Sequence, residues 1–163
     1  MQQKARNKKM PNTYTQIHIH VVFAVQDRAS LIKTEWEERL YQYLIGIIQN
    51  HGHKVLAIGG MPNHIHILFG FRPTESLSAL MLQIKRDSSL WIKENKFVRG
   101  RFSWQEGYGA FSYSKSQLTQ VINYISKQKE HHKKRTFLDE YKKILQDFGI
   151  EYDENYIFKV VDE

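Results

Sequence analysis

Cysteine is absent from this sequence of 163 residues. Disulfides, thiolate metal ligands and cysteine nucleophiles are therefore excluded together, and only histidine, carboxylate or amide side chains could hold a metal. The sequence also lacks the roughly 18 consecutive apolar residues that a membrane span requires, and its N-terminus lacks the apolar core of a signal peptide. From these absences we expect a cytoplasmic protein that does not enter a membrane.

Length and composition are typical of one globular domain. Hydrophobic residues make up 41% of the chain and charged residues 25%, close to the average of folded proteins. Neither an internal repeat nor a low-complexity tract is present. We expect a basic, disordered N-terminal arm over residues 1–12, a single catalytic domain over 13–150 and an acidic tail over 151–163.

Positive charge is concentrated in the body of the chain. The net charge is +7, but residues 136–163 carry a balance of −5 and residues 10–135 a balance of +8. Such an excess suits a polyanionic partner, because lysine and arginine near phosphates displace condensed counterions. A solvated surface tuned for solubility would explain the charge equally well, so charge alone assigns no function.

Hydrophobic periodicity and turn residues predict the order of strands and helices. Strands are predicted over 14–25, 54–60 and 64–71, a strand or irregular hairpin over 102–113, and helices over 34–52, 74–92, 117–131 and 135–148. This order is β-α-β-β-α-β followed by helices. It predicts an α+β fold with a ferredoxin-like antiparallel sheet, helices on one face and additional C-terminal helices. The fold class alone leaves the function open.

Two histidines separated by one residue begin the third predicted strand. Side chains alternate along a strand, so His64 and His66 project side by side from one face, as two ligands of one metal must. Two ordinary solvent-facing histidines would show the same spacing. His18 and His20 repeat it on the first strand, and all four could line one face if the strands are neighbours. The turn at residues 61–63 puts His64 at a strand edge that a ligand can reach, which favours the second pair.

Tyr124 and Gln128 lie four residues apart on the helix predicted over 117–131, so they are neighbours on one face. A tyrosine at the border of an apolar stripe usually serves packing. If Tyr124 instead attacks a phosphate, it needs a nearby metal or cation, because a hydroxyl with a pKa near 10 is a weak nucleophile. Gln128 could complete the metal shell with its amide oxygen.

Basic residues interleaved with aromatic ones suggest a groove for nucleic acid, in which cations follow the phosphates and rings stack on unpaired bases. The aromatic residues are Trp91, Phe97, Phe102 and Trp104. The candidate DNA-binding cations are Arg28, Arg72, Lys85, Arg86, Lys93, Lys96, Arg99 and Arg101.

Three blocks in a fixed order resemble a known family. They are MPNHIHIL, FSWQEGYGAFSYS and YISKQKEHH, and they follow an opening TYTQIHIHVVFAVQDR. Together they resemble the HUH-type single-tyrosine transposases of bacterial insertion sequences, including the relatives associated with repetitive extragenic palindromes. The likeness extends from Met10 to about Phe158.

This resemblance implies a set of roles. His64 and His66 would be the metal-binding histidines, Tyr124 the nucleophile and Gln128 the third metal ligand, with Mg²⁺ or Mn²⁺ as the metal. The reaction would be cleavage of single-stranded DNA, often beside a hairpin, through a 5′-phosphotyrosine intermediate, followed by strand transfer without a nucleotide cofactor. The family also implies a homodimer in which the tyrosine of one subunit can serve the histidine pair of the other.

Two other functions fit parts of the sequence. A non-catalytic or domesticated protein that binds DNA hairpins would keep the fold and the basic surface. A two-histidine phosphoesterase would have paired motifs on two strands, but those enzymes carry threonine or serine where this chain has His20 and His66.

Overall fold

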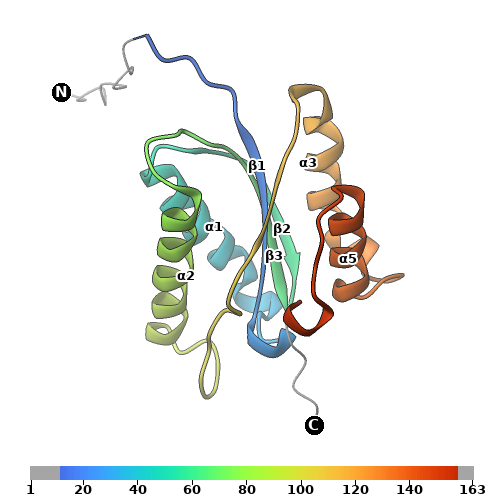
Figure 1. The fold of residues 1–163 in the computed structure, drawn as a ribbon. Coiled ribbons are helices and arrows are strands. Elements are labelled where there is room, and N and C mark those ends of the chain that lie inside the picture. Colours follow the sequence, from blue (N-terminus) through green and yellow to red (C-terminus); the bar gives the residue numbers. More distant parts are fainter. Residues whose placement is uncertain (1–11, 158–163) are drawn as a thin grey trace, which may run out of the picture.

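The computed structural model describes residues 12–157, which form three layers (Figure 1). The middle layer is an antiparallel sheet with the strand order β2-β3-β1-β4. Its strands are β1 (His18–Ala24), β2 (Lys54–Met61), β3 (His64–Gly70) and β4 (Gly109–Ser112). The predicted ferredoxin-like α+β fold is confirmed.

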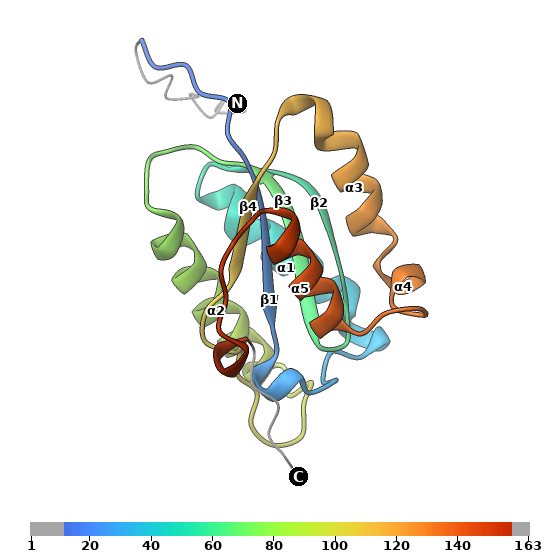
Figure 2. The ribbon, with the colours of Figure 1, turned by 45° about the vertical axis from the view of Figure 1, so that its right-hand side comes forward.

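Helices cover both faces of the sheet, as Figures 1 and 2 show. On one face lie α1 (Thr34–Asn50) and α2 (Leu77–Glu94), and on the other α3 (Leu118–Ser126), α4 (Gln128–His131) and α5 (Phe137–Asp147). Short 3-10 helices occur at Gln26–Arg28, Lys115–Gln117 and Glu154–Tyr156. The C-terminal helices therefore enclose the sheet face that would otherwise be open to water.

Alternating side chains of β1 divide the interior into two clusters. Val21, Phe23 and Val25 pack into the main core beneath α1 and α2. Val22 and Ala24 point to the opposite face, where they pack with Phe137, Tyr141 and Leu145 of α5. The sheet is buried on both sides, so polar side chains on the α5 face must find partners inside the protein.

Several predicted element boundaries were wrong. The first strand, expected over 14–25, spans His18–Ala24. The helix expected over 117–131 is interrupted at Lys127, whose φ of −105° and ψ of 24° are not helical. The helix expected from residue 74 begins at Leu77, because the Ser76 side chain accepts a hydrogen bond from the Ala79 amide and caps it there. Within the segment 102–113, only Gly109–Ser112 forms a strand of the sheet.

The described chain ends at Ile157, which is buried against the cluster that contains α5. The predicted arm, apart from Asn12, and residues 158–163 of the predicted tail lie outside the described residues. Within residues 12–157, no helix combines the length and apolar character that a membrane crossing needs.

Candidate active site

His64 and His66 project from β3 toward α5 and are fully buried, with 0% of either residue exposed. Their rings lie 5.1 Å apart between centroids. The side-by-side arrangement predicted from strand alternation is therefore present. The alternative of two solvent-facing histidines is contradicted, because α5 covers this face and the Phe137 ring stacks on His64 at 3.9 Å.

Each imidazole has a partner on its Nδ1 atom. His64 Nδ1 lies 2.7 Å from Asn63 Oδ1, and His66 Nδ1 lies 2.8 Å from His20 Nε2. An amide oxygen only accepts, so the neutral His64 ring carries its proton on Nδ1 and turns the lone pair of Nε2 inward. Partners of this kind on the outer nitrogen are what orient metal-binding histidines.

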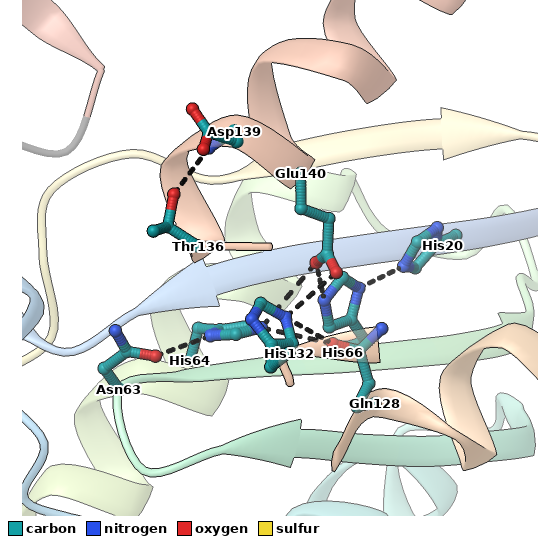
Figure 3. Close-up of polar contacts among 9 residues, drawn as sticks. All are labelled: His20, Asn63, His64, His66, Gln128, His132, Thr136, Asp139 and Glu140. Atoms are coloured by element: carbon teal, nitrogen blue, oxygen red, sulfur yellow. Dashed lines mark hydrogen bonds and ion pairs between the residues drawn. The ribbon is translucent and has the colours of Figure 1, made fainter. Parts of the chain in front are cut away.

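Glu140 of α5 supplies a carboxylate that we did not predict from the sequence (Figure 3). Its Oε1 lies 2.9 Å from His66 Nε2 and 3.7 Å from His64 Nε2, and its Oε2 lies 2.9 Å from His132 Nε2. Burial alone would raise the pKa of this carboxyl, but hydrogen bonds from His132 and His66 and the neighbouring imidazoles hold the pKa well below its usual range. Glu140 is therefore an anion inside the protein.

Gln128 is the first residue of α4 and only 2% of it is exposed. Its Oε1 lies 3.3 Å from His64 Nε2 and 3.1 Å from His132 Nε2. The amide nitrogen is buried without a hydrogen-bond partner among the described residues. The interruption at Lys127 thus separates Gln128 from the helix of Tyr124, yet both side chains still reach the same site.

Tyr124 lies on α3, partly buried beside the histidines. Its ring centroid is 5.8 Å from that of His66, with the planes nearly perpendicular, and 5.1 Å from that of His131. Burial raises the pKa of Tyr124 above its ordinary value, and the charge of Glu140 raises it further, while the polar side chain of Gln128 acts in the opposite direction. The hydroxyl is therefore protonated at neutral pH.

The inward-facing donor atoms fit a divalent metal. One ligand atom each of His64, His66 and Glu140 lies within 4.8 Å of the other two. Ligand atoms around an ion with bonds of roughly 2.1 Å stand about 3 to 3.5 Å apart. The two distances from Glu140 Oε1, 2.9 Å to His66 Nε2 and 3.7 Å to His64 Nε2, are close to this range. Burial lowers the pKa of His64 well below its ordinary value. The lone pair on its Nε2 consequently faces oxygen atoms of Gln128 and Glu140, a repulsive arrangement that a cation between them would make attractive.

Sequence reasoning paired His64 with His66 but missed two side chains of the cluster. His132 follows α4, and its side chain is 6% exposed. Glu140 belongs to a helix that the sequence predicted, but the sequence did not predict that this helix packs on the histidines. A signal for Glu140 did exist, because it lies on the buried stripe of α5 with Phe137, Tyr141 and Leu145. An acid within an otherwise apolar stripe is unusual and marks a candidate functional group.

Of the candidate DNA-binding cations, those on α2 lie on the opposite side of the sheet from Tyr124. Lys85 and Arg86 lie on α2, across the sheet from α3 and α5 (Figure 1). The Lys85 ammonium donates to the carbonyl oxygens of Gln105 at 2.8 Å and Gly107 at 2.5 Å, so it serves the fold. Lys93 lies in the last turn of α2 and Arg28 ends the 3-10 helix Gln26–Arg28, whereas the other four lie in connecting segments: Arg72, Lys96, Arg99 and Arg101.

Comparison with known proteins gives consistent matches. A family model described as IS200-like transposase matches residues 13–128. The ISDra2 transposase TnpA of Deinococcus radiodurans is 23% identical over 118 residues, which cover 69% of this chain and 84% of that protein.

Two solved structures share the fold. A protein of Deinococcus radiodurans R1 assigned as a transposase aligns with a TM-score of 0.56 and 22% identity, over 74% of this chain and 97% of the other. A REP-associated tyrosine transposase bound to a REP hairpin aligns with a TM-score of 0.58 and 15% identity, over 93% and 92% of the two chains.

Proposed function

Since this chain belongs to the IS200-like transposase family, whose model matches residues 13–128, we propose that it cleaves and rejoins single-stranded DNA through Tyr124 in a metal-dependent reaction. One observation carries this proposal: the Tyr124 ring lies beside a buried cluster in which His64, His66 and Glu140 turn ligand atoms toward one another. Structural ion pairs also occur inside proteins, but they seldom combine with a tyrosine, an amide oxygen and an adjoining cavity.

The metal ligands in this proposal are His64 and His66 through Nε2, Glu140 through a carboxylate oxygen and Gln128 through its amide oxygen. A bound Mg²⁺ or Mn²⁺ would polarise the phosphate and stabilise charge on the leaving oxygen. The two imidazole donors favour Mn²⁺, because Mg²⁺ prefers oxygen ligands. His20 and Asn63 act as positioning residues, since each occupies the outer nitrogen of one ligand histidine.

Cleavage then follows from what the side chains can do. The Tyr124 oxygen forms a bond to phosphorus while the bond from phosphorus to the 3′ oxygen breaks. The products are a 5′-phosphotyrosine and a free 3′-hydroxyl, and the phenol proton balances the charge on the departing oxygen. Because the phosphodiester energy is kept in the covalent link, the hydroxyl of a second strand can reverse the step and join the DNA without a nucleotide cofactor.

The partner in this proposal is single-stranded DNA beside a hairpin, and the solved REP-associated relative bound to a REP hairpin supports it. A DNA substrate also agrees with the cytoplasmic location expected from the sequence. We retain the homodimer as part of the proposal. Tyr124 and the histidine pair adjoin within one chain, which supports a site completed in cis rather than by a partner subunit.

A covalent adduct tests the proposal. The full chain is incubated with Mn²⁺ and single-stranded oligonucleotides that carry hairpins, and the protein is then run on a denaturing gel. We expect a shifted band with the wild type and none with Tyr124→Phe. Tyr156→Phe, a matched change at a residue that is 80% exposed and does not line the cavity beside Tyr124, should retain the band.

Two results would contradict the assignment. An undiminished adduct in Tyr124→Phe would exclude this residue as the nucleophile. Hairpin binding without an adduct across all substrates would favour the non-catalytic alternative, a DNA-hairpin-binding protein of the same fold.

A further inference from the structure

We propose that the cavity between α3 and α5 binds one unpaired nucleotide of the cleaved strand, immediately beside the phosphate that Tyr124 attacks. This inference rests on the proposed function and adds a subsite to it. The cavity has a volume of about 720 Å³, within the range of roughly 300–1,000 Å³ that small-molecule sites occupy. Tyr124 and Glu140 both line it, so a group bound there touches the reacting centre.

An aromatic wall gives the cavity a surface for a base. Phe148 directly follows α5 and is 40% exposed, although it packs on Phe111 with centroids 4.9 Å apart. Tyr113 meets it edge to face at 5.5 Å. Phe148 is therefore an aromatic ring fixed from behind and partly open in front, and both rings line the cavity. Stacking on such a ring accepts any base, because every base has a π-face.

Cations at the mouth suit the phosphates on either side of that base. Lys134 and Arg135 line the cavity, and neither forms an ion pair with a residue in the described range 12–157. Lys143, also in the lining, is instead paired with Asp147 at 2.9 Å. Lys134 and Arg135 also border a second hollow of about 590 Å³ beside Asn63. The two free cations thus connect both sides of the metal-binding cluster.

The occupant must be unpaired. Chemistry at a position enclosed by helices requires a base to leave the stack, because a base inside a duplex presents only its edges. The lining combines an aromatic surface, free cations and the attacking tyrosine, which together match a nucleoside joined to phosphates. Three carboxylates also line the cavity, but Asp147 is paired with Lys143 and Glu140 with His66 and His132, which leaves Glu130. Lys134 and Arg135 therefore outnumber the remaining acid, and an apolar peptide segment would leave them without anions.

Binding in the absence of cleavage tests this subsite. Tyr124→Phe of the full chain, with Mn²⁺, selects tight binders from single-stranded oligonucleotides that have a randomised segment beside a hairpin. Each position of one selected sequence is then replaced by an abasic residue. We expect one abasic position to weaken binding by about 5- to 150-fold, the loss of one stacked base. Adding Phe148→Leu should cause a similar loss on the intact oligonucleotide and remove the sensitivity at that position.

Controls separate stacking from folding and from chemistry. Phe148→Tyr retains an aromatic face and should bind normally, and thermal unfolding verifies that each variant is folded. Replacing Lys134 and Arg135 with glutamine should lower the slope of log affinity against log salt by about 1.4. Lys142→Gln is the control and should lower the slope less, because Lys142 is already paired with Glu154.

Abasic substitution without effect at every position, or an abasic effect that persists in Phe148→Leu, would overturn the subsite. Failure to select any single-stranded DNA would overturn it as well. Adduct formation by the wild type on the selected sequence is scored separately. An adduct without abasic sensitivity therefore refutes the subsite alone, and abasic sensitivity without an adduct refutes only the proposed cleavage.

Discussion

Replacing Glu140 with glutamine should abolish most of the affinity of the site for Mn²⁺. Glutamine has nearly the shape of glutamate but no charge, so the fold around α5 is retained while the only carboxylate among the three clustered ligand residues is lost. Removing a partner in the outer shell of a metal site already costs about 10- to 100-fold in affinity. Loss of a charged direct ligand should therefore reach at least about 100-fold.

This loss translates into a thermal shift that can be measured. With Mn²⁺ at about 100 times the wild-type Kd, binding stabilises the folded state by about 2.7 kcal/mol, and a variant with about 100-fold weaker affinity gains only about 0.4 kcal/mol. In a chain of this size, 1 kcal/mol shifts the Tm by about 2 to 4 °C. We therefore expect Mn²⁺ to raise the Tm of the wild type by about 5 to 11 °C and that of Glu140→Gln by about 1 to 2 °C.

Each variant must be compared with its own metal-free form. Glu140→Gln also exchanges charge-assisted hydrogen bonds with His66 and His132 for neutral ones, which costs about 1 to 3 kcal/mol without metal. Asp139→Asn is the matched control, because the Asp139 side chain is exposed and lies on the same helix, and it forms no ion pair with another residue of the range 12–157. Equal Mn²⁺-induced shifts in wild type and Glu140→Gln would refute the role of Glu140 as a ligand.

Three more predictions concern the surroundings of this site. Mixing Tyr124→Phe with His64→Ala should form no adduct if the site is completed in cis, and recovery of adduct in the mixture would show that a partner's histidine pair is used. Burial lowers the pKa of His20 and His64 below the ordinary value of 6.5 in the folded protein. As the pH falls through that value, the unfolded chain therefore binds more protons than the folded one, and the free energy of unfolding decreases. Urea unfolding should show lower stability at pH 5 than at pH 7, and equal stabilities would contradict this reasoning. Gly59→Ala should destabilise the protein by about 1 to 3 kcal/mol and reduce adduct formation, because a Cβ there would overlap a backbone carbonyl of α3. Gly46→Ala, in open space on α1, should instead stabilise by about 1 kcal/mol, and equal denaturation midpoints for the two variants would contradict the close contact.

The part of the site that follows a regular period could be predicted from the sequence. Strand alternation alone places His64 beside His66, and the element order makes β1 and β3 neighbours. His20 accordingly reaches His66, as expected if both histidine motifs shared one face, whereas no side-chain contact among residues 12–157 brings His18 into the cluster. Local rules succeed here because the geometry of a strand is nearly independent of what packs on it.

The rest of the site depends on contacts between distant segments. No glycine or proline occurs at or next to Lys127, so the predicted helix extended through this residue. In the structure the helix is interrupted there, and Gln128 is buried against His64. Glu140 reaches the histidines only because α5 crosses the sheet, and its approach to His66 spans 74 residues of sequence. The interleaving of basic and aromatic residues, from which the DNA-binding cations were predicted, contains no information about which cations lie near Tyr124 in the fold.

The segment beyond residue 128 determines how DNA could reach the proposed chemistry. The family model ends at Gln128, yet α5 lies over the histidines, stacks Phe137 on His64 and provides Glu140. By excluding water, it strengthens every electrostatic interaction around Tyr124. The same helix covers the direct approach to β3, so in the proposed reaction a strand would approach Tyr124 along the cavity between α3 and α5. If the proposal holds, the spacing of these two helices, rather than the sheet, would determine which nucleotides fit beside the attacked phosphate.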